Sequence, residues 1–356
     1  MTDPRDDRDP GVTSGGVPAR DTSIAASAAA AHGAGPAHGT GLARHRGRPA
    51  GRGRRTAIAA GALVVAAGVV AAAASAPGGP GTASAPAADG VDPSGVVMPR
   101  SDGGPWERVF SEDFGDDAAT GRFESRYADR FSVYHGFADT AGTGRYQAST
   151  LSTHDGVLDM HLRTTDGGTP LAGGLVPLVD GQWGGQTSGR YSIRMKSDRV
   201  DGYGVAVLLW SDDNVWSDGE VDFPEGALGL PAHLNVHCLQ DPAQKCLQYE
   251  TRASLADWHT YTIEWTPSRM SFLVDGDVIG TTTESIPTAR MHLVVQAGSN
   301  GGHPPRTAAG SLLVDWLTID VPAPGARPEA SLPSGRAEVP ERGSWIAKDP
   351  SAADGG

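Results

Sequence analysis

Three acidic residues, Glu220, Asp222 and Glu225, lie within six consecutive positions of the chain. Residues 216–226 read Trp-Ser-Asp-Gly-Glu-Val-Asp-Phe-Pro-Glu-Gly. Glu220 and Asp222 are two residues apart, so on a β-strand both side chains point to one face of the sheet. Strict alternation would turn Glu225 to the other face, but the extra residue of a β-bulge returns it. Pro224 supports a bulge, because proline within a sheet is confined to edges and bulges.

A surface with three carboxyl groups suits acid–base chemistry, although a solvated acidic face is its ordinary explanation. Val221 and Phe223 indicate that the other face of the strand is packed, and Trp210 and Trp216 are near in the sequence, as a sugar-binding site requires. Crowded negative charge raises the proton affinity of at least one carboxyl group. Retaining cleavage of a glycosidic bond uses two such groups, about 5–5.5 Å apart, as nucleophile and general acid. We therefore favour a catalytic interpretation.

The surrounding sequence predicts strands rather than helices. Apolar and polar residues alternate over several short segments, and Asp275-Gly276 marks a hairpin turn. The predicted strands are 157–163, 189–196, 259–265, 270–274, 278–280, 291–296 and 312–319. Short strands separated by turns, without a fixed repeat period, predict an all-β sandwich.

Residues 220–225, Glu-Val-Asp-Phe-Pro-Glu, resemble the bulged Glu-x-Asp-x-x-Glu signature of glycoside hydrolase family 16, which is typical of laminarinases, agarases and carrageenases. Other segments are similar to this family's strands in the same order: 110–114, 189–196, 258–265, 274–276 and 314–316. The resemblance implies a concanavalin-like β-jelly-roll whose concave face forms a cleft for a polysaccharide.

The resemblance also implies roles for individual residues. Glu220 would be the nucleophile, Asp222 its helper and Glu225 the general acid/base. Trp216 would form a platform for a sugar ring. The family's usual aromatic residues are missing from 204–210, where Trp210 is displaced, so the sugar-binding floor must differ.

Two further residues match positions that face the cleft in the family. His237 would contact substrate, although a buried structural histidine is an alternative, and Gln296 stands where the family more often has asparagine. No cofactor is required for this chemistry. Some members bind structural calcium on the convex side, and Asp113 and Asp315 would be the matching ligands here.

Composition divides the chain into five parts. Residues 1–55 and 322–356 have too few large apolar side chains to fold, and we expect them to be disordered. The apolar segment 56–76 is predicted to be a signal peptide or a signal anchor. A flexible linker, 77–104, then leads to the glycosidase domain, 105–321. Six arginines between residues 44 and 55 precede the apolar segment, consistent with the positive-inside rule. We expect the folded domain outside the cell, secreted or membrane-anchored. A formal net charge of −13 argues against a nucleic-acid partner, and we expect a monomer.

Cys238 and Cys246 are the two cysteines, and they flank a short polar stretch. In an oxidising compartment we expect a disulfide that closes this loop. Two free thiols, or metal binding by Cys238 with His237 or His233, are the alternatives.

The sequence leaves several activities open. The first is endo-hydrolysis of a β-1,3- or mixed β-1,3/1,4-glucan, and the others are hydrolysis of another β-linked polymer such as a galactan, transglycosylation, and carbohydrate binding without catalysis. The intact set of three carboxyl groups argues against a binding module, which has no use for them.

Overall fold

The computed structural model describes residues 92–100 and 104–332. The predictions for residues 1–55 and 56–76 therefore fall outside the described part of the chain. Within that part, no helix has the length and apolar character needed to cross a membrane.

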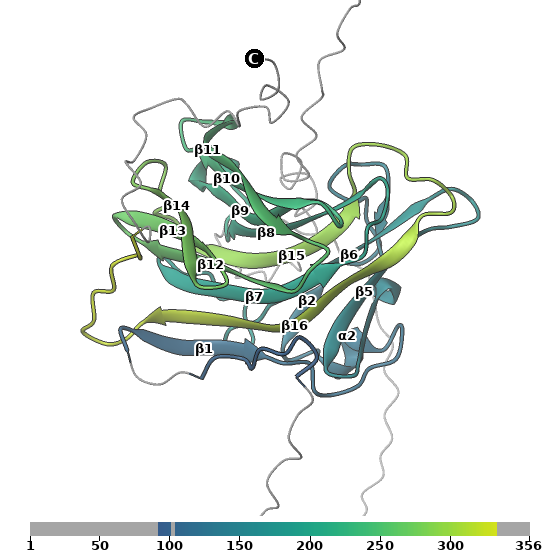
Figure 1. The fold of residues 1–356 in the computed structure, drawn as a ribbon, viewed down its shortest axis with the longest axis horizontal. Coiled ribbons are helices and arrows are strands. Elements are labelled where there is room, and N and C mark those ends of the chain that lie inside the picture. Colours follow the sequence, from purple (N-terminus) through teal and green to yellow (C-terminus); the bar gives the residue numbers. More distant parts are fainter. Residues whose placement is uncertain (1–91, 101–103, 333–356) are drawn as a thin grey trace, which may run out of the picture. The chain divides into compact units, whose positions relative to one another are not determined.

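The regular secondary structure of the described chain consists almost entirely of β-strands (Figure 1). The strands are β1 (Trp106–Glu112), β2 (Phe131–Val133), β3 (Arg145–Tyr146), β4 (Leu151–His154), β5 (Val157–Thr164), β6 (Pro170–Pro177), β7 (Gly189–Ser197), β8 (Tyr203–Ser211), β9 (Glu220–Ala227), β10 (Pro231–Cys238), β11 (Asp241–Ser254), β12 (His259–Thr266), β13 (Arg269–Val274), β14 (Asp277–Thr282), β15 (Met291–Ser299) and β16 (Ala309–Pro322). Short helical turns are α2 (Phe123–Arg126), η2 (Ala148–Thr150) and η3 (Trp216–Asp218).

These strands form two curved sheets. The front sheet has the order β11-β10-β9-β8-β15-β6, and the back sheet has the order β14-β13-β12-β7-β16-β5, with β1 added along β16 (Figure 1). β6 pairs with both β15 and β5 and so connects the sheets. Neighbouring strands along both sheets are antiparallel, and the predicted all-β sandwich is confirmed.

The core lies between the two sheets, because alternate residues of each strand face inward. On β7, Tyr191 and Ile193 belong to the buried core. From the front sheet, Phe223 packs edge-on against Tyr261 and Phe272 of the back sheet, with ring centres 5.4 and 5.8 Å apart. The inner face of β9 is thus anchored in the core, which fixes the side chains on its outer face.

Segments on both sides of the predicted domain also contact the back sheet. Arg194 Nε donates to Ser94 Oγ at 2.6 Å, and Trp316 Nε1 donates to the Val96 carbonyl at 2.9 Å. Beyond β16, the amide of Ser331 donates to Glu264 Oε2 at 2.8 Å. Part of the stretch predicted as a linker and the start of the predicted tail therefore lie against the outer face of this sheet.

The disulfide between Cys238 and Cys246 is present, as predicted. It joins the end of β10 to β11, and so closes the hairpin formed by these two paired strands.

Candidate active site

The predicted bulge lies in the middle of β9. Against β8, Asp222 is opposite Leu208 and Glu225 is opposite Ala206, so two residues of β9 correspond to one residue of β8. The extra residue falls at Phe223-Pro224, whose peptide bond is cis. The register shift returns Glu225 to the outer face, where Asn235 Nδ2 donates to its Oε2 atom. We call the outer face of the front sheet that carries Glu220, Asp222 and Glu225 the acidic face.

The acidic face is a regular array set by the registers of four strands. One row across the sheet contains His292, Trp210 and Glu220, on β15, β8 and β9. The row containing Asp222 continues to Asn235 on β10. The array brings residues far apart in sequence to one surface, where their charges interact.

Glu220 and Asp222 are buried together, which disfavours ionisation of both. Burial raises the pKa of Glu220 well above its usual value, and the charge of Asp222 adds to this, whereas a hydrogen bond from Trp216 opposes it. Burial and then the charge of Glu225 raise the pKa of Asp222 to about 6. The pair therefore retains a proton into the weakly acidic range, as expected for crowded carboxyl groups.

Trp216 contacts Glu220 directly. Its Nε1 atom donates to Glu220 Oε2 at 2.5 Å, and the side chain is partly buried. Glu220 Oε1 has no hydrogen-bond partner among residues 92–100 and 104–332. One oxygen of Glu220 is thus held by a hydrogen bond, and the other has no partner in the described part of the chain.

His237 lies beside both acids. Its Nε2 atom is 3.4 Å from Asp222 Oδ2 and 3.9 Å from Glu220 Oε2. Burial lowers the pKa of His237, but the hydrogen bond and charge of Asp222 outweigh it, and the net shift is upward. Its Nδ1 atom is 2.6 Å from the carbonyl of Pro242, an acceptor that requires a proton on Nδ1. Pro242 lies in the disulfide-closed loop, so this loop sets the orientation of His237.

Gln296 lies two strands from Glu225, opposite Ala206. The hydroxyl of Tyr146 donates to Gln296 Oε1 at 2.8 Å, and Thr140 Oγ1 donates to the same oxygen at 3.2 Å. The Nε2 group of Gln296 is buried without a partner in the described part of the chain. Because its oxygen is occupied, Gln296 presents a hydrogen-bond donor on the acidic face.

Trp210 is fully buried, with its Nε1 atom donating to Asn214 Oδ1 at 3.0 Å. It packs in an aromatic and aliphatic cluster with Tyr134, Tyr146 and Leu208. Trp210 therefore lies on the acidic face, in the row of Glu220, but its neighbours cover it, so it offers no exposed ring. Trp216 is the partly exposed indole next to Glu220.

The two aspartates predicted to bind calcium lie on the back-sheet side of the domain. Asp315 stands where the register of β16 shifts, and burial raises its pKa to about 6, with Ser94 opposing the shift and Asp92 adding to it. Asp113 Oδ1 accepts a hydrogen bond from the amide of Gly115. Asp315 Oδ2 is a buried oxygen without a partner in the described part of the chain, a donor suited to a hard cation. Calcium binding by Asp113 and Asp315 stays a prediction.

Among the described residues, one group of at least three acidic, histidine or cysteine side chains has atoms close enough to hold a metal ion. It consists of Glu220, Asp222 and His237, whose candidate atoms lie within 4.8 Å of one another. The same spacing suits proton sharing between carboxyl groups, which needs no metal.

Several residues of the site were not predicted. Asn235 could have been found, because it alternates with Leu234 and Val236 on the strand that carries His237. No local pattern in the sequence indicated that the hydroxyls of Tyr146 and Thr140 contact Gln296, because the two residues lie 150 and 156 positions away from it.

Comparison with known proteins agrees with this arrangement. Residues 184–318 match the model of glycosyl hydrolases family 16, and this range contains Glu220, Asp222 and Glu225. The predicted resemblance to this family is confirmed, and the match supports a glycoside hydrolase. No curated protein matches the chain in sequence.

Solved structures share the jelly-roll fold. A laminarinase from Flavobacterium sp. UMI-01 is 14% identical, with a TM-score of 0.50, covering 60% of this chain and 99% of the laminarinase. SCLam, a non-specific endo-β-1,3(4)-glucanase from family GH16, is 17% identical, with a TM-score of 0.51, covering 64% of this chain and 95% of SCLam. A structure described under endo-acting O-glycanases of the human gut microbiota is 14% identical, with a TM-score of 0.50 and coverages of 60% and 98%. These similarities show the fold.

Proposed function

We propose that this protein is a retaining endo-glycosidase that cleaves internal bonds of a β-1,3- or β-1,3/1,4-glucan. The observation that carries the proposal is the bulge in β9, which gathers Glu220, Asp222 and Glu225 on one buried face. Retaining hydrolysis needs two carboxyl groups that flank the bond to be cleaved: one attacks the anomeric carbon and the other protonates the leaving oxygen.

In the first step, Glu225 donates a proton to the oxygen of the leaving sugar while Glu220 Oε1 forms a bond to the anomeric carbon. The bond between that carbon and the leaving oxygen breaks, and a covalent glycosyl-enzyme results. In the second step, Glu225 removes a proton from water, whose oxygen displaces Glu220 and restores both carboxyl groups. Asp222 takes up the proton that it shares with Glu220, so that Glu220 is ionised when it attacks.

The contacts of Glu220 support its role as nucleophile. The Trp216 Nε1 hydrogen bond at 2.5 Å stabilises negative charge on Oε2, while Oε1 has no partner in the described part of the chain. Asn235 holds Glu225 through Oε2. The two glutamates are thus positioned by different neighbours, which allows them to serve different functions.

The choice of glucan rests on the fold shared with the laminarinase and the β-1,3(4)-glucanase. Another β-linked polymer, such as a galactan, and transfer to a sugar acceptor are the alternatives. One observation favours these alternatives. On β8, the residues of the acidic face are Ala206, Leu208 and the buried Trp210, so this strand offers no exposed indole on which a glucose ring could stack. Action outside the cell is also part of the proposal, and the disulfide suits an oxidising compartment.

The test is to incubate the full-length protein with β-1,3-glucan, mixed-linkage glucan and galactans. We expect oligosaccharides from one of the glucans, released first with the β-configuration as seen by proton NMR. Inverted products would contradict the mechanism. Transfer products in excess over hydrolysis would identify a transglycosylase, and binding without any product would identify a carbohydrate-binding module.

Variants of the two glutamates assign their roles. Glu220→Gln should reduce turnover by at least about 10³-fold. Glu225→Ala should be partly rescued by azide with an activated aryl glycoside, because such a leaving group needs no proton and azide can replace the activated water. Glu107→Gln, at an exposed position on β1, is the matched control and should retain full activity. Near-normal activity of Glu220→Gln would refute the assignment.

A further inference from the structure

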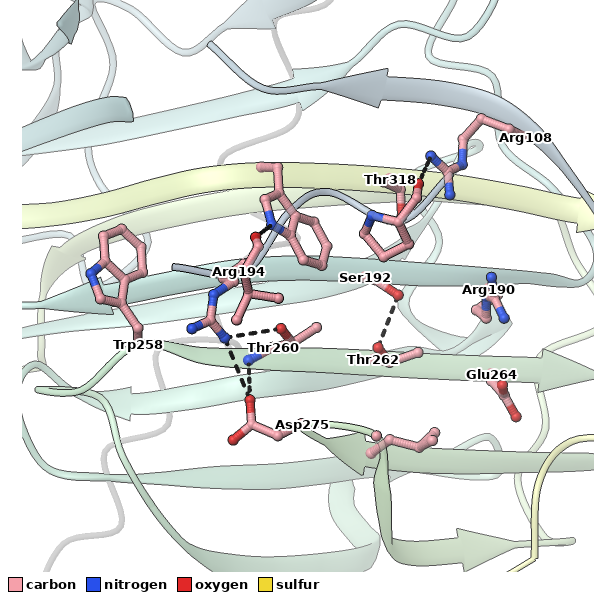
Figure 2. A pocket seen from close by; sticks show the side chains of 15 residues that line it. Arg108, Arg190, Ser192, Arg194, Trp258, Thr260, Thr262, Glu264, Asp275 and Thr318 are labelled. Atoms are coloured by element: carbon pink, nitrogen blue, oxygen red, sulfur yellow. Dashed lines mark hydrogen bonds and ion pairs between the residues drawn. The ribbon is translucent and has the colours of Figure 1, made fainter. Parts of the chain in front are cut away.

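The outer face of the back sheet contains a hollow of about 540 Å³ (Figure 2). It lies across β16, β7, β12 and β13, and the segment 92–100 contributes Val96 and Pro99 to its wall. This volume is within the range of roughly 300–1,000 Å³ that is typical of small-ligand sites.

The hollow is separated from the acidic face by the whole core. Ser192 and Thr262 line it, while their neighbours Tyr191 and Tyr261 point into the core. Tyr261 contacts Phe223, which projects inward from β9 on the other sheet. The two sites therefore lie back to back on opposite sides of the sandwich.

Hydroxyl groups form the floor of the hollow. Ser192 and Thr262 hydrogen-bond to each other at 2.9 Å, and Thr318 of β16 lies beside Ser192 in the same row (Figure 2). A hydroxyl group both donates and accepts a hydrogen bond. Such a floor can therefore match the hydroxyls of a sugar, which have the same dual character.

The two ends of the hollow differ. Trp258 lies at one end, and Arg190 and Glu264 lie at the other (Figure 2). Lys196 Nζ is 5.2 Å from the centre of the Trp258 ring, a cation–π contact that limits its movement. An indole held at the end of a polar groove provides a flat apolar surface on which a sugar ring can stack.

The arginines of the hollow are neutralised by carboxylates. Asp320 is ion-paired with both Arg108, at 2.5 Å, and Arg190, at 3.2 Å. Arg194 Nη1 is 3.6 Å from Asp275 Oδ1. An anion would have to compete with these carboxylates. With Glu264, which also lines the hollow, three carboxylates balance the three arginines. The planar donors are thus held in fixed positions without net positive charge, which suits a neutral ligand with many hydroxyls.

We propose that this hollow is a second, non-catalytic binding site for a neutral oligosaccharide segment. Trp258 stacks on one sugar ring, the hydroxyl floor binds along the chain, and Arg190 and Glu264 bind hydroxyls at the far end. A site on the opposite side from the carboxyl groups holds the protein on a polymer without occupying the catalytic residues. The site stands whether or not the proposed hydrolysis is correct, because it is defined by binding alone.

The experiment measures binding by calorimetry to full-length Glu220→Gln, which prevents turnover. The probes are a six-unit β-1,3-glucan oligosaccharide and, separately, inorganic sulfate. We expect saccharide binding that falls at least tenfold at one of two sites when Trp258→Ala is added. Thr262→Val, which keeps the shape but removes a floor hydroxyl, should weaken the same site. Trp216→Ala is the matched control and should affect the other site.

Turnover separates this proposal from the proposed function. With wild-type Glu220, Trp258→Ala should leave hydrolysis of a short aryl glycoside unchanged and reduce retention on insoluble β-glucan. Saccharide binding that is unaffected by both Trp258→Ala and Thr262→Val would overturn the proposal. The proposal would also be overturned if the protein bound sulfate but no saccharide, and if Trp258→Ala abolished the sulfate binding. That result would show an anion site. Absence of any turnover, with two saccharide sites intact, would refute only the proposed function.

Discussion

Buried carboxyl groups have opposite surroundings on the two outer faces of the sandwich. On the back sheet, Asp320 is 2% exposed and forms ion pairs with two arginines. On the front sheet, Glu220 and Asp222 are fully buried beside each other, and atoms Glu220 Oε1 and Asp222 Oδ1 have no hydrogen-bond partner in the described part of the chain. Buried charge that is paired belongs to the scaffold, whereas buried charge that is crowded costs stability and indicates function.

The difference has a consequence for mutagenesis. Removing a charge from the back sheet should lower stability, because its partners are left unpaired. Removing the carboxylate charge of Glu220 or Asp222 should raise stability at neutral pH, because an unfavourable ionisation is eliminated. Activity should fall when a carboxylate of the acidic face is removed and should change little when a charge of the back sheet is removed.

The largest change in stability is expected for Asp320→Ala. Without the carboxylate, Arg108 and Arg190 lose their common partner, and the free energy of unfolding should fall by about 2–4 kcal/mol. Urea unfolding measures the change. Asp277→Ala, at an exposed position on β14, is the control and should change stability by less than about 0.5 kcal/mol. Equal effects of the two variants would show that the buried ion pairs contribute little.

Asp222→Asn should stabilise the protein at neutral pH. In the folded protein the pKa of Asp222 is about 6, compared with an ordinary value of 3.8. Its contribution to stability is therefore fully present below pH 3.8 and is lost as the pH rises through about 6. Asp222→Asn does not lose this stability as the pH rises. Its free energy of unfolding should therefore exceed that of the wild type by at most about 3 kcal/mol above pH 6, and the difference should disappear near pH 4.

Thermal unfolding as a function of pH checks this prediction. Activity of Asp222→Asn should fall by roughly 10²-fold, because Glu220 loses the neighbour with which it shares a proton. A variant less stable than the wild type at pH 7 would show that the ionised form of Asp222 is favoured in the folded state.

The smallest effect is expected for Tyr146→Phe. Loss of the hydroxyl removes the 2.8 Å hydrogen bond that orients Gln296, and kcat/KM should fall by about tenfold, mainly through KM. Tyr261→Phe is the matched control, since the Tyr261 hydroxyl is buried without a partner in the described part of the chain. If both variants keep wild-type KM, the amide of Gln296 does not bind substrate.

Local patterns in the sequence were sufficient for the framework of the site. Alternation placed Val221 and Phe223 in the core, and Pro224 predicted the bulge that returns Glu225 to the acidic face. The spacing of Cys238 and Cys246 predicted their disulfide. Each of these features is decided by residues that are near one another in the chain.

Features set by distant segments were not predictable. Trp210 points to the acidic face of β8, as predicted, but Asn214 and the neighbouring aromatic cluster bury it. The alternation of residues along a strand predicts the face of a side chain and not which other segments cover it. The contacts of Ser94 and Ser331 with the back sheet depend on small polar residues whose composition resembles that of a linker. Tertiary packing decides such positions.

The most direct test of the account is to trap the covalent intermediate. Incubation with an activated 2-fluoro glycoside of the preferred sugar, followed by proteolysis and mass spectrometry, identifies the labelled residue. We predict a single label on the peptide that carries Glu220, at its side-chain carboxyl group. A label on Glu225, or rapid turnover of the natural polymer with no covalent species in its path, would contradict the central claim.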